Sequence, residues 1–290
     1  MFTKEIKTEF VLSNKVSIPA VGFGTWQSPN MEEPDLDAMA RAVEIAARAG
    51  YRHFDTAADY GNESSIGKGV RNAGLKREEV FITSKVWNDD RGYGKTLAAF
   101  ERTLNELETD YLDLYLIHWP AAPHQYRCWQ QLNEETREAL EDLYEAGRIR
   151  AIGVSNFRQQ HMDALLETAR IVPMVNQIEF HPGFAQLQLA DYCQKKGILV
   201  EAWSPLGTGA VLTSQTVSEI AAKYGKSPAQ VCVRWNLQHG ILPLPKSVTE
   251  SRIIENRDVF DFALDEEDVK RLDEMEFCGG MAFDPDEVDF

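Results

Sequence analysis

Short apolar runs rich in β-branched residues alternate with amphipathic helical patterns from one end of this chain to the other. The candidate strands are Ile18–Phe23, Arg52–Asp55, Val80–Lys85, Leu112–His118, Ala151–Ser155, Val175–Ile178, Leu199–Ala202 and Ile241–Leu244. Strands that alternate with helices favour a parallel sheet, because each parallel connection needs a long crossover that a helix usually supplies. The pattern therefore fits a series of eight βα units.

The segments between the strands carry the signals that start and stop helices. Asp35–Arg48 follows Pro34, repeats apolar residues at helical spacing and stops before Gly50. Further helices are expected at Glu135–Glu145, at Asp191–Lys196 and from Pro228 onwards. A hairpin with its turn at Ser13–Asn14–Lys15 is expected before the first strand, and no linker divides the chain. We therefore predict a single α/β domain over residues 1–290, a (β/α)8 TIM barrel with an N-terminal β-hairpin.

A doubly wound sheet is the competing architecture, and its dinucleotide fingerprint should follow the first strand. The nearest match starts at Gly22, but Gln27 stands where the third glycine belongs, and Pro29 and Pro34 oppose a helix there. The stretch Gly61–Lys68 resembles a phosphate loop with one residue too many between its glycines. Both stretches are interpreted as turns, which leaves the barrel as the prediction.

The composition limits the partners of the chain. Its formal net charge of -16 repels nucleic acid and anionic membrane surfaces, so neither is expected as a partner. No apolar stretch is long enough to cross a bilayer, and the N-terminal segment is too charged for a signal peptide. The four cysteines form no C-x-x-C pair, which is typical of reduced thiols in a cytoplasmic protein. An anionic cofactor would need a local basic cluster on such a chain.

Four polar residues stand at the ends of three neighbouring predicted strands, where the reactive side chains of βα barrels gather. Asp55 ends the second strand with Tyr60 just beyond it, Lys85 ends the third and His118 ends the fourth. Each has an ordinary structural explanation: a turn cap, a packing tyrosine, a lysine that reaches solvent and a core histidine, in the same order. Their coincidence at adjacent strand ends favours a catalytic site.

These residue types suit proton donation to a carbonyl oxygen. Tyrosine has a reference pKa near 10, and the ammonium of Lys85 would lower the pKa of Tyr60. Asp55 would keep Lys85 charged and in place, and His118 would orient the carbonyl. The other histidines form no H-E-x-x-H spacing, and we predict no metal. A proton donor without a metal needs a hydride source, which points to a nicotinamide.

Beyond this chemistry, the chain resembles the aldo-keto reductase family across nearly its whole length. The runs that carry the resemblance are Gly22-Phe23-Gly24-Thr25-Trp26, Asp55-Thr56-Ala57, Tyr60-Gly61-Asn62-Glu63, Thr83-Ser84-Lys85, Leu116-Ile117-His118-Trp119-Pro120, Gly153-Val154-Ser155-Asn156-Phe157, Asn176-Gln177, Trp203-Ser204-Pro205-Leu206-Gly207 and Pro245-Lys246-Ser247. So many motifs in one order are not expected by chance. The acidic tail Phe283–Phe290 further resembles the bacterial 2,5-diketo-D-gluconate reductase-like branch, and we expect this C-terminal loop to lie near the active site.

The resemblance implies an NADPH-dependent reductase of aldehydes and ketones, in which NADPH becomes NADP+. Tyr60 would be the general acid, Lys85 and Asp55 would tune it, and His118 would orient the carbonyl. Relatives with Glu in place of His118 can reduce carbon–carbon double bonds, so this chain is expected to reduce carbonyls.

The resemblance also implies which residues bind the cofactor. Ser155, Asn156 and Gln177 stand where the family holds the nicotinamide carboxamide, and Trp203 stands at the ring-stacking position, where many relatives have Tyr. The other cofactor-binding residues expected are Gly24, Thr25, Ser204, Leu206, Lys246, Ser247, Val248, Thr249, Arg252, Glu255 and Asn256. Lys246 and Arg252 would bind the 2′-phosphate of NADPH. From the residues alone, that segment also fits a solvated helix start with an Arg–Glu pair three residues apart.

Trp26, Trp87 and Trp119 follow strand ends and are expected to wall the substrate site, although any one of them could be a core residue. The branch that the chain resembles accepts small aldehydes, keto esters and keto sugars, and most such relatives act as monomers. Two other functions stay open. Some relatives with this barrel serve as binding or regulatory proteins. A metal-dependent hydrolase is suggested by His53 and Asp55 near one strand end, but we expect these two side chains to point to opposite sides of their strand.

Overall fold

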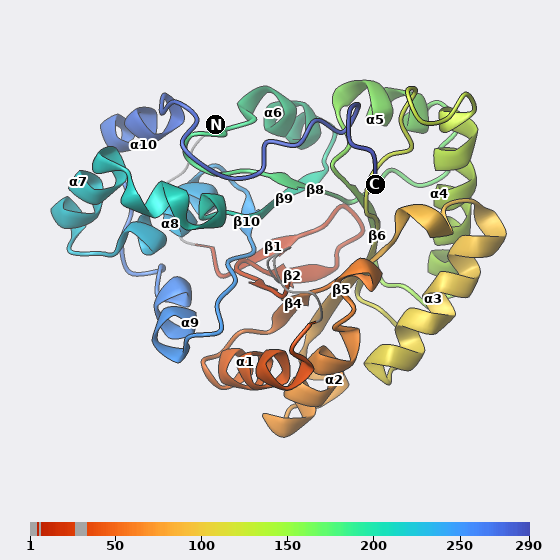
Figure 1. Cartoon of the computed structure of the whole chain (residues 1–290), viewed down its shortest axis with the longest axis horizontal. Coiled ribbons are helices and arrows are strands. Elements are labelled where there is room, and N and C mark those ends of the chain that lie inside the picture. Colours follow the sequence, from red (N-terminus) through yellow and green to blue (C-terminus); the bar gives the residue numbers. More distant parts are fainter. Residues whose placement is uncertain (1–4, 6, 27–33) are drawn as a thin grey trace.

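The computed structural model describes residues 5, 7–26 and 34–290. Its centre is an eight-stranded parallel sheet, enclosed by helices (Figure 1). The strands are β3 (Phe23–Gly24), β4 (His53–Asp55), β5 (Phe81–Val86), β6 (Leu114–Ile117), β7 (Ile152–Ser155), β8 (Val175–Glu179), β9 (Leu199–Trp203) and β10 (Leu242–Pro243). Each strand pairs with the next one along the chain, as in a (β/α)8 barrel, and the predicted fold is confirmed.

The barrel closes where β3 meets β10. Two backbone hydrogen bonds join them: Gly22 N donates to Pro243 O at 3.0 Å, and Gly24 N donates to Pro245 O at 3.2 Å. Both prolines lack an N–H, so Pro243 in β10 and Pro245 just after it can only accept hydrogen bonds, through their carbonyl groups. A Cβ at Gly24 would lie 2.8 Å from the carbonyl oxygen of Leu244. Glycine is therefore required here for the close approach of the two strands.

The expected first strand, Ile18–Phe23, is wrong as one element, because the structure divides it between two sheets. Its first part lies in β2 (Ser17–Pro19), which forms the predicted hairpin with β1 (Glu9–Val11), and only Phe23–Gly24 joins the barrel. The chain bends between the two parts. All the residues of the run are apolar or small, so the sequence pattern does not reveal the bend.

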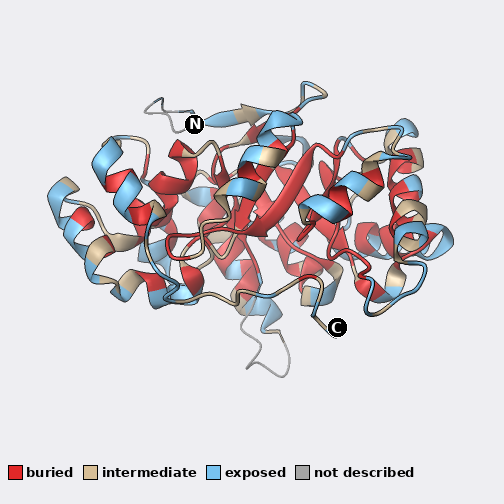
Figure 2. Cartoon of the chain, turned by 90° about the horizontal axis from the view of Figure 1, so that it is seen from above, coloured by how far each residue is buried: buried red, intermediate tan, exposed pale blue. Residues whose placement is uncertain are grey.

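The hairpin covers the end of the barrel opposite the C-terminal segment (Figure 2). Its turn is where the sequence predicts it, and the side-chain oxygen of Asn14 accepts a hydrogen bond from Val16 N at 3.1 Å. Leu12 and Ile18 pack with apolar residues of β5, β6, β8 and β10. This end of the barrel is therefore filled by hydrophobic side chains and leaves the other end for polar groups.

Ten α-helices surround the sheet in the described part of the chain: α1 (Leu36–Arg48), α2 (Glu63–Asn72), α3 (Tyr93–Leu107), α4 (Trp129–Glu145), α5 (Gln159–Leu166), α6 (Leu187–Lys195), α7 (Gln215–Tyr224), α8 (Pro228–Gln238), α9 (Glu250–Arg257) and α10 (Glu266–Asp273). Within these described residues, no helix has the length and apolarity needed to cross a bilayer.

The helix boundaries follow the predictions where a capping side chain is present. The Asp35 carboxylate accepts from Ala38 N at α1, and the Ser227 hydroxyl accepts from Gln230 N at α8. The helices α4 and α6 begin earlier than expected, and neither start has a side-chain cap that would mark it in the sequence. The turn expected over Gly61–Lys68 is wrong beyond Asn62, because α2 begins at Glu63.

Gly24→Ala tests the closure of the barrel. The added methyl group would force β3 away from Leu244 O, and overpacking of this kind costs about 1–3 kcal/mol. We expect the midpoint of thermal unfolding, followed by circular dichroism, to fall by several degrees. Gly94→Ala is the control, because a Cβ there would meet no atom within 4 Å. Equal unfolding midpoints for the two variants would contradict this account of β3 and β10.

Candidate active site

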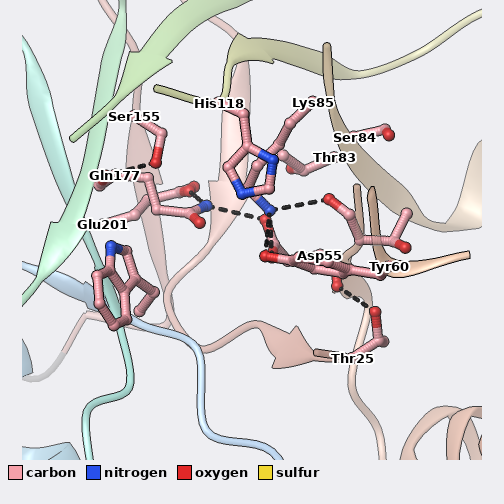
Figure 3. Close-up of polar contacts among 12 residues, drawn as sticks. Thr25, Asp55, Tyr60, Thr83, Ser84, Lys85, His118, Ser155, Gln177 and Glu201 are labelled. Carbon is pink, nitrogen blue, oxygen red and sulfur yellow. Dashed lines mark hydrogen bonds and ion pairs between the residues drawn. The ribbon is translucent and has the colours of Figure 1, made fainter. Parts of the chain in front are cut away.

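The four predicted catalytic residues converge at the C-terminal ends of neighbouring strands (Figure 3). Asp55 is the last residue of β4, Lys85 lies near the end of β5, and His118 directly follows β6. Tyr60 ends a single 3-10 turn, Ala58–Tyr60, that follows β4. The register of the parallel strands thus brings side chains from separate βα units to one place.

A buried ion pair lies at the centre of this site. Lys85 Nζ is 2.7 Å from Asp55 Oδ1, donates to Thr56 O at 2.8 Å and lies 3.4 Å from the Tyr60 hydroxyl. Lys85 is fully buried, and Asp55 is 3% exposed. Burial on its own lowers the pKa of the Lys85 ammonium, but Asp55 and Tyr60 more than offset this, and the pKa lies above its usual value. Lys85 therefore stays protonated.

The pKa of Tyr60 moves in the direction opposite to the expected one. Burial raises the pKa of its hydroxyl to about 12, although the Lys85 ammonium beside it acts to lower that pKa. Asp55 opposes the effect of Lys85 and raises the pKa further. The expected decrease rests on the ammonium alone, and burial together with the Asp55 carboxylate outweighs it. Tyr60 consequently keeps its proton throughout the neutral pH range.

His118 is neutral at physiological pH. Burial, and then the positive charges of Lys85 and Arg91, hold its pKa well below the usual value. Its ring meets the rings of Tyr60 and Trp87 edge-on, with centroids 5.6 and 5.1 Å apart. The imidazole therefore stands next to the Tyr60 ring as an uncharged hydrogen-bonding group.

A second layer of hydrogen bonds connects the residues expected to hold the nicotinamide. Asn156 Nδ2 donates to His118 O at 3.0 Å and to Ser155 Oγ at 3.1 Å, and Asn156 Oδ1 accepts from Trp203 Nε1 at 2.8 Å. Gln177 Nε2 donates to Asp55 Oδ2 at 2.8 Å. The structure thus brings these four predicted residues together beside the ion pair.

Glu201 belongs to this layer, and the sequence reasoning missed it. Gln177 Nε2 also donates to Glu201 Oε2 at 2.8 Å, and Glu201 is fully buried. Burial, followed by the charge of Asp55, raises the pKa of the Glu201 carboxyl to about 8. The available signal was a carboxylate inside the apolar strand β9, two positions before Trp203 and so on the same face of the strand.

The predicted phosphate-binding segment follows β10 and leads into α9. Lys246 is half-buried, and this burial lowers the pKa of its ammonium. Its Cβ lies next to β3, 3.6 Å from the position that a Cβ on Gly24 would take. Arg252 is exposed, and among the described residues neither cation forms a salt bridge, so the Arg252–Glu255 pair of the alternative reading is not formed. Ser247 Oγ accepts from Thr249 N at 3.1 Å, while Val248 is exposed and Asn256 is buried.

The other predicted cofactor residues lie on the turns beside this segment. Thr25, next to Gly24, donates through its hydroxyl to Asp55 O at 2.8 Å. After β9 the backbone turns sharply: Ser204 has a φ of 52°, and Leu206 O accepts from Gly209 N at 2.9 Å. These turns place backbone groups at the same end of the barrel as the ion pair.

Aromatic rings wall the space beside His118. Trp87 and Phe290 stack with ring centroids 5.9 Å apart, and Trp119 meets Phe290 and Phe283 edge-on at 5.1 and 6.1 Å. A cavity of about 570 Å³ borders the Trp87–Phe290 pair; it is lined by Trp87, Asn88, Asp89, Gln125, Tyr126, Asp289 and Phe290, and His118 is not part of its lining. Trp26 is 39% exposed and makes no ring contact with the described residues, and its place in the wall stays a prediction.

The C-terminal segment lies near the active site, as the sequence predicts, and it crosses this end of the barrel, which the sequence left open (Figure 1). The Glu179 carboxylate at the end of β8 accepts from Met281 N and Ala282 N, both at 2.7 Å. Farther along, Arg158 Nη1 lies 2.9 Å from Asp284, and Asn88 Nδ2 donates to Phe290 O at 2.8 Å. Phe283 and Phe290 were not predicted as site residues, because the tryptophans that they contact are more than 160 positions away in the sequence.

The expectation that His53 and Asp55 point to opposite sides of their strand is wrong. Residues two apart on a strand share a face, and here His53 contacts Thr83 Oγ1 at 3.0 Å while Asp55 contacts Lys85, both on β5. Burial lowers the pKa of His53 to about 3. No group of three or more His, Cys, Asp or Glu side chains that could hold a metal ion occurs in the described ranges.

Comparison with known proteins gives a consistent result. The aldo/keto reductase family model matches residues 20–276. The chain is 48% identical to glyoxal reductase of Bacillus subtilis (strain 168), over 98% of this chain and 99% of that protein. It is 40% identical to methylglyoxal reductase DkgA of Escherichia coli O157:H7, over 93% and 94% of the two chains.

A solved structure shows the same likeness in three dimensions. The aldo-keto reductase AKR2E4 of Bombyx mori, in complex with NADP, superposes with a TM-score of 0.84 at 36% identity, with 93% of each chain covered. The barrel, the motifs at its strand ends and these matches lead to one conclusion: the chain belongs to the aldo/keto reductase family.

Proposed function

We propose that this protein is an NADPH-dependent reductase that converts small aldehydes and ketones to alcohols, with Tyr60 as the proton donor. The observation that carries the proposal is the buried Lys85–Asp55 pair, which touches the Tyr60 hydroxyl beside a neutral His118 at the C-terminal end of a barrel. This is the end at which βα barrels act.

The residues present suit a phosphorylated dinucleotide. Lys246 and Arg252 lack carboxylate partners among the described residues of a chain whose net charge is -16, so they supply a local anion site. Paired Lys and Arg groups bind a phosphate monoester more strongly than a hydroxyl, which favours NADPH over NADH. Solved relatives in complex with NADP or NADPH support this choice. The bound cofactor would supply the hydride.

The proton then comes from the chain itself. A pKa near 12 makes Tyr60 a weak acid, but the oxygen of a reduced carbonyl is a stronger base than a phenolate, so the transfer stays favourable. The Lys85 ammonium, 3.4 Å from the hydroxyl, stabilises the phenolate as it forms. His118 would hydrogen-bond the carbonyl oxygen and hold it near Tyr60.

Small aldehydes and ketoaldehydes are the substrates that the site fits best, with keto esters and keto sugars as further candidates. The aromatic wall of Trp87, Trp119 and Phe290 excludes water from the carbonyl carbon. The names of two relatives, a glyoxal and a methylglyoxal reductase, point the same way. We also propose that residues 1–290 form one domain, since the eight strands from Phe23 to Pro243 belong to one sheet. From the family resemblance we propose further that the protein acts as a cytoplasmic monomer.

Tyr60→Phe tests the proton donor. The variant keeps the ring and removes only the hydroxyl, so the turnover number for methylglyoxal reduction, measured as loss of NADPH absorbance, should fall by about 10²–10⁴-fold. NADPH affinity, measured by quenching of tryptophan fluorescence, should stay within about twofold of that of the unaltered protein. The Tyr60 hydroxyl acts on the substrate carbonyl and takes no part in holding the cofactor. Turnover close to that of the unaltered protein would show that another group is the acid.

Lys246→Ala tests the phosphate site. Loss of one charge-assisted contact should weaken NADPH about 10- to 100-fold and leave NADH nearly unchanged, as measured by the same fluorescence titration. Lys226→Ala is the matched control, because this lysine lies between α7 and α8, pairs with Asp261 and should not affect either cofactor. An equal loss for NADPH and NADH in Lys246→Ala would overturn the 2′-phosphate assignment.

A further inference from the structure

Glu201 is a buried acid that the proposed mechanism does not use. It sits on β9 in the barrel interior, in register with Gln177 on β8 and Leu242 on β10. Its Oε2 accepts from Gln177, whereas its Oε1 is buried and has no hydrogen-bond partner among the described residues. A buried polar atom without a partner is uncommon and calls for an explanation.

The amide of Gln177 is the link between Glu201 and the catalytic pair (Figure 3). Its single nitrogen donates to Asp55 Oδ2 and to Glu201 Oε2, both at 2.8 Å, so both of its N–H groups are used on acids. Only the nitrogen of an amide can face two such acceptors, which turns its carbonyl oxygen away from them. The orientation of Gln177 is therefore fixed by Asp55 and Glu201 together.

The Glu201 carboxyl is neutral when protonated and carries one negative charge when ionised. The charged groups that face it are Asp55 on β4 and Lys85 on β5, while the residues in register on β8 and β10 do not titrate. With Glu201 protonated, the charges of Lys85 and Asp55 cancel. With Glu201 ionised, this buried cluster carries one net negative charge. The raised pKa, about 8, places the change within reach of ordinary buffers.

We infer that Glu201 is a positioning residue that holds the Gln177 amide towards the cofactor and, through its proton, sets the preference of the pocket for oxidised over reduced nicotinamide. This inference rests on the proposed NADPH-dependent function. The nicotinamide ring is neutral in NADPH and positively charged in NADP+, so an added buried negative charge favours NADP+ selectively. By linkage, NADP+ binding in turn favours loss of the Glu201 proton.

The test is a pair of fluorescence titrations, with NADP+ and with NADPH, between pH 6.5 and 9.5. For the unaltered protein, the affinity for NADP+ relative to that for NADPH should rise about tenfold as the pH passes through 8. A tenfold change corresponds to a shift of roughly one pKa unit in Glu201 between the two cofactor forms. The comparison of the two forms cancels effects on the shared phosphates and on Lys246. In Glu201→Gln the ratio should stay flat, because Gln keeps the oxygen that accepts from Gln177 but cannot ionise.

Glu63→Gln is the matched control for this titration. Glu63 is also a buried acid with a raised pKa, but it accepts from Ser84 and Thr103 rather than from Gln177. Glu63→Gln should keep the pH dependence of the unaltered protein. If the ratio of NADP+ to NADPH affinity in Glu201→Gln changed with pH as it does in the unaltered protein, this inference would be overturned and the proposed function would stand. Failure of the unaltered protein to bind either nucleotide would overturn the proposed function, and the inference with it.

Thermal unfolding gives a second readout that needs no cofactor. The pKa of Glu201 is higher in the folded chain than in the unfolded one, so the folded state retains a proton that the unfolded state loses, and stability falls as pH rises from about 4.5 to about 8. Glu201→Gln lacks this loss. Its unfolding temperature relative to the unaltered protein should therefore increase between pH 5 and pH 8.5, and a constant difference would contradict a proton on Glu201.

Discussion

The ion pair between Lys85 and Asp55 is the interaction on which the rest of the site depends. Removing two charges from water costs several kcal/mol per ion, and a pair in the protein interior often contributes nothing to stability. Here the remaining donors of Lys85 reach Thr56 O and the Tyr60 hydroxyl, and the second oxygen of Asp55 accepts from Gln177. The pair therefore orders the groups around it, and we assign it a role in catalysis rather than in the stability of the fold.

The two ends of the barrel serve different purposes. At one end the hairpin places Leu12 and Ile18 against apolar strand residues, and Gly24 lets β3 approach β10 closely enough to close the sheet. At the other end the strands finish in polar side chains, and Phe290 of the C-terminal segment packs on Trp87 and accepts a hydrogen bond from Asn88 beside them. Hydrophobic packing at the first end stabilises the scaffold that holds the buried charges at the second.

Much of this arrangement could be predicted from the sequence because it depends on local patterns. The alternation of strands and helices gave the barrel, and residues at strand ends, such as Asp55 and His118, gave the site. What could not be predicted depends on contacts between distant residues. The net pKa of Tyr60 follows from burial that the sequence does not show, and Phe290 reaches Trp87 across more than 200 positions. Glu201 looked like one more residue of β9 until its bond to Gln177 was visible.

The role of the ion pair is tested by replacing both of its members, Lys85→Met together with Asp55→Asn, so that no unpaired charge stays buried. The measurement is the turnover number for NADPH-dependent reduction of methylglyoxal, on protein shown by circular dichroism to be folded. We expect a folded barrel with an unfolding temperature near that of the unaltered protein and a turnover number at least about 100-fold lower. A folded double variant that reduces methylglyoxal at close to the original rate would contradict this role of the ion pair.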